Sequence, residues 1–240
     1  MNMGGAVDCH AHWGPSVSLQ ITVTTQDILK QADEALAEKV VVFPFPSEAI
    51  RNAEVNRVLL DESVRVRKFI PFYYVLDDLK APRDERYRGV KWHWVRGVQD
   101  STSNPSFLSD PSLEPFLNSI REMNIPILIE EDLEVTCEFV KKAEGTSIII
   151  PHLGMLGGSP YDFLQRLAKF ENVHFDSSLA STQTLTDFIK EIGASRILFG
   201  SDIPFGRMGN ELQKVLALDI GRKEIEAIIR ENILKLTGFP

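Results

Sequence analysis

Cysteine is scarce in this sequence, and long hydrophobic runs are missing altogether. Only two of the 240 residues are cysteines, Cys9 and Cys137, and neither lies in a CxxC spacing. A disulfide framework of the secreted kind is therefore excluded, as is a CxxC metal or redox site, and both side chains are expected to pack in the interior. No apolar run approaches the roughly 20 residues of a membrane span, and residues 1–6 lack the features of a signal peptide. We expect a cytoplasmic protein with no membrane partner.

Positive charge is also in deficit. The chain carries 26 Lys and Arg residues against 34 Asp and Glu residues, a formal net charge of −8, and its basic residues form no run. Neutralising nucleic-acid phosphates requires clustered Lys and Arg side chains, so the sequence argues against a nucleic-acid partner. It favours a small-molecule substrate and is compatible with a homo-oligomer.

What the sequence does contain is a regular alternation of apolar runs and helical patterns. Several runs are continuously apolar and β-branched, such as Ile148-Ile149-Ile150, which is typical of strands buried on both faces of a parallel sheet. We therefore expect eight parallel strands, and antiparallel hairpins are disfavoured. The runs cover residues 6–12, 39–45, 67–75, 89–95, 125–131, 147–153, 173–179 and 197–203.

Helix-start signals separate the runs. A Ser, Thr, Asp or Asn residue caps a helix, and a proline that follows it suits the first helical position. The final helix carries Ile225, Ile228, Ile229 and Leu236 at helical spacing. The expected starts are Thr24 or Thr25, Asp110-Pro111 and Ser159-Pro160.

The pattern is a strand followed by a helix, repeated eight times. Right-handed crossovers then close either a barrel or an open doubly wound sheet. The strand count, the chain length and the lack of a Gly-rich nucleotide loop favour the barrel, so we predict an α/β fold of the (β/α)8 TIM-barrel type with a single domain over residues 1–240. Two connections, residues 76–88 and 96–109, are charged or polar and could cover a site.

Histidines stand where the first strand ends. In this type of barrel the active site is built at the carboxyl ends of the strands. The first run ends in Asp8-Cys9-His10-Ala11-His12, and strict alternation places Asp8, His10 and His12 on one face. Two inward imidazoles are a candidate metal pair, although solvated strand ends produce the same spacing.

Two further strand ends carry ionisable groups. His152 stands where the sixth run meets a Gly-rich loop, and Asp202 lies near the end of the eighth run. Burying an aspartate is costly unless it is paired or binds a metal. Taken singly, His152 could be a core histidine and Asp202 a helix N-cap. Four such groups on strands one, six and eight favour a shared site.

These motifs, in this order along nearly the whole chain, resemble the metal-dependent amidohydrolase superfamily. The resemblance is to its amidohydrolase-2 branch, which includes the aminocarboxymuconate-semialdehyde decarboxylase-like enzymes. The motifs HxH, HLG and FGSDxP are jointly specific. The resemblance rests on residues 8–12, 89–93, 110–111 with 125–129, 151–154, 172–178, 199–204 and 232–236.

The resemblance implies a distorted (β/α)8 barrel with one divalent metal, usually zinc, at the carboxyl ends of the strands. It implies His10 and His12 as first-strand ligands, and Asp202 as a ligand that also takes a proton from the bound water. His152 matches a sixth-strand histidine that assists catalysis. A bound metal can lower the pKa of water from 15.7 to about 7, and a neighbouring carboxylate can then act as the base.

The fifth strand departs from this family's pattern. The family usually has a histidine at the end of that strand, whereas residues 126–132 contain none. Spacing from Pro126 places Glu130 at the histidine's position, where it could serve as an oxygen ligand. Two imidazoles and two carboxylates would cancel the charge of a divalent cation, so the site should acidify its water less and accept manganese more readily. The alternative is that Glu130 pairs with a nearby cation such as Lys91.

Three functions are compatible with these residues. The first is a metal-dependent hydrolase that activates water to attack a small-molecule amide, ester or lactone. The second is a metal-dependent non-oxidative decarboxylase, a carboxy-lyase of the same superfamily. The third, a catalytically weakened barrel that acts as a binding protein, rests only on the missing fifth-strand histidine. We expect an enzyme with one divalent metal, zinc in the first place and manganese as the alternative.

Overall fold

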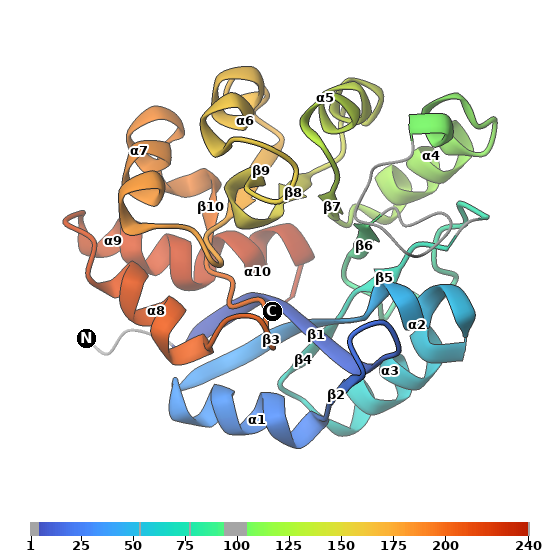
Figure 1. The fold of residues 1–240 in the computed structure, drawn as a ribbon, viewed down its shortest axis with the longest axis horizontal. Helices are drawn as coiled ribbons and strands as arrows, with labels where there is room; N and C mark the ends of the chain where they lie inside the picture. The colour runs from blue at the N-terminus through green and yellow to red at the C-terminus, as the bar shows by residue number, and fades with distance from the viewer. Residues whose placement is uncertain (1–4, 53, 77, 94–104, 240) are drawn as a thin grey trace.

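A ring of strands lies at the centre of the molecule, with helices around it (Figure 1). The computed structural model describes residues 5–52, 54–76, 78–93 and 105–239. The strands are β1 (Ala6–Ser16), β2 (Ile21–Val23), β3 (Ala37–Pro44), β4 (Phe69–Pro71), β5 (Tyr73–Tyr74), β6 (Val90–His93), β7 (Ile127–Glu130), β8 (Ile148–Ile150), β9 (Val173–Asp176) and β10 (Ile197–Leu198). All eight predicted runs therefore contain a strand, and the third run contains two.

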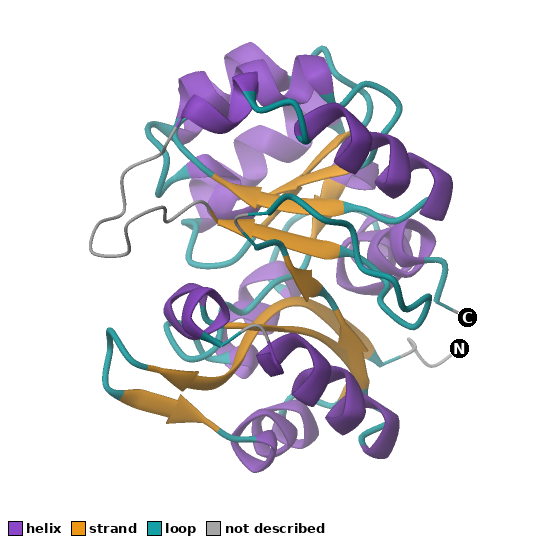
Figure 2. Cartoon of the chain, turned by 90° about the vertical axis from the view of Figure 1, so that its right-hand side faces the viewer, coloured by secondary structure: helices purple, strands orange, loops and turns teal. Residues whose placement is uncertain are grey.

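The helices lie on the outer side of the strands (Figure 2). They are α1 (Thr25–Glu34), α2 (Pro46–Arg51), α3 (Glu54–Arg65), α4 (Leu113–Met123), α5 (Leu133–Lys142), α6 (Pro160–Leu167), α7 (Thr182–Ile192), α8 (Met208–Leu216), α9 (Arg222–Glu226) and α10 (Asn232–Thr237). Short 3₁₀ helices cover Pro105–Ser109, Pro151–Gly154 and Ala194–Arg196, and a π-helical turn (Ala227–Glu231) joins α9 to α10. None of the helices in the described residues is long and apolar enough to cross a membrane.

Two of the three expected helix starts are confirmed. Thr24 caps α1 in a reciprocal capping box with Asp27, and Ser159 is the N-cap of α6 with Pro160 behind it. The start at Asp110 is wrong, because α4 begins at Leu113. The Asp110 carboxylate instead accepts the N–H of Ser112 at 2.8 Å, and this local turn competes with the helix. Residues 78–88 form turns without a helix, and residues 96–104 of the other long connection lie outside the described residues.

The strands belong to two sheets that are joined at both edges. The sheet orders are β2-β1-β3-β4 and β10-β9-β8-β7-β6-β5. At one junction only Phe72 separates β4 from β5, and its N–H donates to the carbonyl of Val42 at 2.9 Å. At the other, β1 pairs with the chain that follows β10, through Cys9 N–H to Phe199 O at 2.9 Å and a parallel bridge between Ala11 and Ile203. The protein is an α/β protein of the TIM-barrel type.

Antiparallel hairpins, which the sequence disfavours, occur at one place. β1 runs past the predicted end of the strand to Ser16 and pairs antiparallel with β2, with Gly14 opposite Val23 and Ser16 opposite Ile21. These last residues of β1 lie beyond the barrel wall. One edge of the strand is unpaired there, and β2 pairs with it when the chain turns back. All other strand pairs are parallel.

Apolar side chains fill the barrel and leave its carboxyl end to polar groups. Both cysteines are buried, as expected: Cys9 lies inside the barrel and Cys137 lies between strands and helices. At the amino ends of the strands, Ile233 of α10 belongs to the interior cluster and Phe239 packs against it. The cluster comprises Val7, Cys9, Val41, Phe43, Ile70, Phe72, Leu128, Ile149, Leu198 and Ile233.

Candidate metal centre

A β-bulge in β1 aims both of its histidines at the barrel axis. The register of β1 against β3 shifts between Asp8 and Ala11, so strict alternation fails there. Cys9 belongs to the interior cluster, and His10 and His12 both lie against the interior ring of Phe43, with ring centroids 5.1 and 4.9 Å away. The inward direction of the two histidines is therefore confirmed.

The placement of Asp8 on the same face is wrong for the same reason. Its carboxylate lies against the segment after β10, where Oδ1 accepts the N–H of Ser201 at 2.9 Å and the N–H of His10 at 3.0 Å. Oδ2 accepts the hydroxyl of Ser201. Burial raises the pKa of Asp8 to about 7, although these hydrogen bonds act to lower it. Asp8 thus fastens β1 to the Asp202 loop.

Asp202 lies directly opposite the two histidines. Its Oδ1 is 3.2 Å from Nε2 of His10 and 3.4 Å from Nε2 of His12, and all three residues are buried. Asp202 has φ 56°, in the left-handed region, and its N–H is tied to the carbonyl of His10 at 2.8 Å. A residue held in this unfavourable region next to functional groups indicates that the fold fixes its direction.

A second buried carboxylate, Asp176, orients His10 from behind. It is the last residue of β9, and its Oδ2 is 2.8 Å from Nδ1 of His10. Burial raises the pKa of Asp176, but the attraction and hydrogen bond of His10 outweigh it, and the pKa is lowered overall. An ionised carboxylate only accepts, so His10 carries its proton on Nδ1 and its Nε2 lone pair faces Asp202. A histidine with a carboxylate partner of this kind is a typical metal ligand.

Asp176 also sets the tautomer of His152 through Ser178. The Ser178 hydroxyl contacts both Oδ1 of Asp176 and, at 2.8 Å, Nδ1 of His152. Because its single proton goes to the carboxylate, the hydroxyl oxygen accepts from Nδ1–H of His152. The other nitrogen, Nε2, then faces the site, 3.8 Å from Oδ2 of Asp202.

The donor set fits a divalent cation. Within the described part of the chain, neither Nε2 of His10 nor Oδ1 of Asp202 has a hydrogen-bond partner, although both atoms are buried. Two atoms that both present lone pairs at 3.2 Å repel each other, and either a shared proton or a metal cation between them relieves this repulsion. The 3.2 and 3.4 Å separations are also close to the edge of a tetrahedron around zinc, about 3.3–3.6 Å for ligand distances of roughly 2.0–2.2 Å. Burial raises the pKa of Asp202 despite His10 and His152, and a bound cation would oppose that rise.

Glu130 lies at the edge of this cluster and faces Lys91. It ends β7, and its Oε2 accepts from Nζ of the fully buried Lys91 at 2.6 Å. Its Oε1 is 4.0 Å from Nε2 of His152. Among the described residues, two sets of three side chains are spaced closely enough to share a cation. The first is His10, His12 and Asp202, and the second is His10, His152 and Asp176. The ion pair with Lys91 is the alternative expected from the sequence, and ligation by Glu130 stays a prediction.

Asp176 and Ser178 are the site residues that sequence reasoning missed. Both belong to residues 172–178, one of the motifs that carry the family resemblance, but the motif alone indicates no role for them. A signal was present, because Asp176 ends an apolar strand just as Asp202 follows one. The contact that gives it a role spans 166 residues of sequence, so only the barrel closure reveals its partner.

The fold is an α/β barrel, and a buried cluster of histidines and aspartates lies at the carboxyl ends of its strands. This combination is typical of barrel enzymes that bind a catalytic metal at that end. The particular family follows from comparison: the family model described as Amidohydrolase matches residues 7–239. The chain belongs to the amidohydrolase family and is an enzyme of that superfamily. No curated protein matches it.

Solved structures share the fold at low sequence identity. A 2,6-dihydroxybenzoate decarboxylase from Rhizobium is 18% identical with a TM-score of 0.75, covering 98% of this chain and 99% of its own. An amidohydrolase from Burkholderia multivorans with bound zinc is 14% identical, TM-score 0.79, covering 98% and 100%. A dihydroxybenzoic acid decarboxylase from Polaromonas sp. JS666, with bound manganese and the inhibitor 2-nitroresorcinol, is 16% identical, TM-score 0.79, covering 98% and 97%. At these identities the likeness shows the fold alone.

Proposed function

We propose that this protein is a metal-dependent hydrolase of a small-molecule amide, ester or lactone. The observation that carries the proposal is the convergence of Nε2 of His10 and Nε2 of His12 on one oxygen of Asp202, at 3.2 and 3.4 Å. These three residues would hold one divalent metal, with zinc as the first choice and manganese as the alternative. When bound, such a cation lowers the pKa of a coordinated water and polarises a carbonyl group.

The two oxygens of Asp202 face different partners, which separates two roles. Oδ1 faces the β1 histidines, whereas Oδ2 lies 3.8 Å from Nε2 of His152. We assign to Oδ2 the removal of a proton from the attacking water, because burial raises the pKa of this carboxyl and makes it a stronger base than an exposed aspartate. His152, with Nε2 unprotonated in its neutral form, can pass that proton on to the leaving group.

A second candidate function is non-oxidative decarboxylation. Two of the compared structures are decarboxylases of hydroxybenzoates, and one of them holds manganese. In that reaction the bond between a ring carbon and the carboxylate breaks, carbon dioxide leaves, and the ring carbon takes a proton. Burial raises the pKa of Asp202, and a protonated Asp202 could donate that proton.

A paired substrate screen tests both functions on the metal-loaded protein. Lactones, esters and amides are followed by acid release in a pH-stat, and hydroxybenzoates are followed by carbon dioxide release. Asp202→Asn and the exposed control Asp219→Asn are measured beside the wild type. Acid release that Asp202→Asn abolishes supports hydrolysis, and carbon dioxide release alone supports decarboxylation. Neither product from protein loaded with zinc or manganese would contradict both functions.

A further inference from the structure

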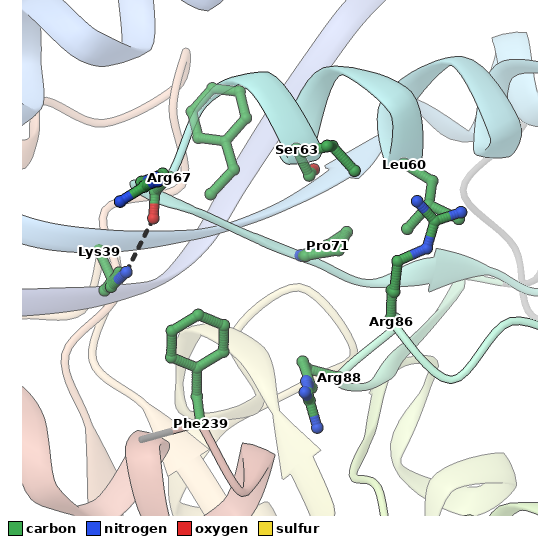
Figure 3. A pocket seen from close by; sticks show the side chains of 10 residues that line it. Lys39, Leu60, Ser63, Arg67, Pro71, Arg86, Arg88 and Phe239 are labelled. Carbon is green, nitrogen blue, oxygen red and sulfur yellow. Dashed lines mark hydrogen bonds between the residues drawn. The ribbon is translucent and has the colours of Figure 1, made fainter.

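A basic hollow lies at the amino ends of the strands, the end opposite to the metal centre. It has a volume of about 360 Å³ and is bounded by α3, β4 and the segment after α10 (Figure 3). Its polar rim contains Lys39, Arg67, Arg86 and Arg88. None of the described residues that line it is acidic. This is an unusual composition for a chain with a net charge of −8.

Of the four cations that line the hollow, Arg86 alone has an ion pair among the described residues. In the described residues no carboxylate lies within salt-bridge distance of Lys39, Arg67 or Arg88, whereas Arg86 pairs with Asp84 at 2.7 Å. Nζ of Lys39 instead donates to the carbonyl of Arg67 at 2.8 Å. Like charges gathered in one hollow repel, so the arrangement favours an anion.

An aromatic ring lies between two of these cations. The ring of Phe239 has Nζ of Lys39 4.6 Å from its centroid and the guanidinium of Arg88 5.9 Å away. Leu60 and Phe69 extend the apolar wall behind the rim. The hollow therefore offers a ligand both apolar contact area and forked guanidinium donors, which suit a carboxylate or a phosphate group. Its volume falls in the range of roughly 300–1,000 Å³ of small-molecule sites.

We propose that this hollow is a second binding site, separate from the metal centre, for a small organic anion with an apolar ring or chain. The anionic group lies against Arg67, Arg88 and Lys39, and the apolar body packs on Phe239 and Phe69. The proposal does not depend on the reaction at the metal centre, because the lining residues of the hollow include none of the site residues.

Calorimetric titration with benzoate and phenyl phosphate tests the proposal. The proteins are the wild type, Arg67→Gln/Arg88→Gln, and the charge-matched control Arg65→Gln/Arg83→Gln, whose residues do not line the hollow. A fourth protein, His10→Ala/His12→Ala, removes anion binding at the metal centre. Benzyl alcohol and inorganic phosphate are titrated as the apolar and the anionic half of the ligand, and the thermal unfolding midpoint checks that each variant is folded.

We expect one saturable site per chain that persists in His10→Ala/His12→Ala. Binding should weaken by about tenfold or more in Arg67→Gln/Arg88→Gln and by less than about twofold in the control, as loss of charge-assisted hydrogen bonds predicts. The stronger of benzoate and phenyl phosphate identifies the anionic group. Equal loss in both charge variants would show a diffuse charge effect and overturn the proposal. Binding confined to the metal centre, or equal binding of benzyl alcohol or inorganic phosphate, would overturn it as well.

Discussion

One carboxylate, Asp176, determines which nitrogen two histidines present to the site. It accepts Nδ1–H of His10 directly at 2.8 Å, and it reaches Nδ1 of His152 through the Ser178 hydroxyl. Both Nε2 lone pairs are thereby directed at Asp202. Asp176 acts through other residues, so it is a positioning residue in this site.

Asp176→Asn is expected to weaken metal binding while preserving the fold. The amide has nearly the same shape but no charge, so it holds the Nδ1–H tautomer of His10 less firmly. Loss of such a partner typically costs 10–100-fold in metal affinity. A competition titration with a zinc chelator measures it, with Asp219→Asn as the control. Unchanged zinc affinity in Asp176→Asn would contradict the role given to this residue.

Asp202→Asn is expected to lower turnover by roughly 10²–10⁴, the range for loss of a general acid or base. Asparagine retains an oxygen that can face the histidines, so the metal content should fall less than the activity. Steady-state kinetics on whichever substrate the screen finds, beside metal analysis, separates the two effects. Turnover close to the wild-type rate would remove Asp202 from the proton transfer.

Glu130 has two competing roles, and substitution distinguishes them. If the ion pair with Lys91 is its role, Glu130→Ala leaves a buried ammonium unpaired, a loss of about 3–5 kcal/mol in the free energy of unfolding, and Glu130→Ala/Lys91→Met recovers most of it. If Glu130 is a ligand, Glu130→Ala weakens metal binding and Glu130→His shifts the preference from manganese toward zinc.

The geometry supports the ion pair, because Nζ of Lys91 lies 2.6 Å from Oε2 of Glu130. Urea unfolding and paired zinc and manganese titrations of these variants provide the measurement. Identical metal affinities in wild type, Glu130→His and Glu130→Ala would place Glu130 outside the coordination sphere. A stability unchanged in Glu130→Ala would contradict the structural role instead.

At the scale of the element, β1 shows what sequence periodicity can and cannot predict. Its run of apolar residues and its two histidines predict a strand with a polar end, and the structure confirms both. The bulge between Asp8 and Ala11 leaves no signal in the sequence, because it adds one residue to the strand without changing residue types. The hairpin with β2 was missed because that three-residue strand has two exposed residues and no long apolar run.

His174, on β9, makes the stability depend on pH. Burial lowers the pKa of His174 to about 4, with Arg196 contributing, whereas in the unfolded chain it is near 6.5. Since the folded pKa is the lower of the two, this histidine's contribution to stability is complete above pH 6.5. It is lost as the pH falls through 4, because protonation then favours the unfolded chain.

His174→Asn should therefore flatten the decline in unfolding free energy between pH 6.5 and 4 by up to about 3 kcal/mol. Urea unfolding of both proteins across this window gives the difference, in which the contributions of all other groups cancel. Parallel curves for the two proteins would mean that His174 titrates normally in the folded state.

At the scale of the whole molecule, closure of the barrel assembles the site. The eight apolar runs that hold barrel strands and the strand-end positions of His10, His12, His152 and Asp202 could be predicted, because barrels place their active sites at the carboxyl ends of strands. The pairs His10–Asp176 and Asp8–Ser201 could not, since they join segments 166 and 193 residues apart. Their identity depends on the register with which β1 meets the chain after β10, which local sequence does not determine.

We propose that His10, His12 and Asp202 together hold one divalent metal, and the metal content of the protein tests this directly. Inductively coupled plasma mass spectrometry of the purified protein, before and after reconstitution with zinc or manganese, measures the metal content per chain. We expect about one metal per chain in the wild type and near none in a folded His10→Ala/His12→Ala variant, with Asp219→Asn matching the wild type. A wild-type protein that retains no metal after reconstitution, or a double variant that retains the full content, would contradict it.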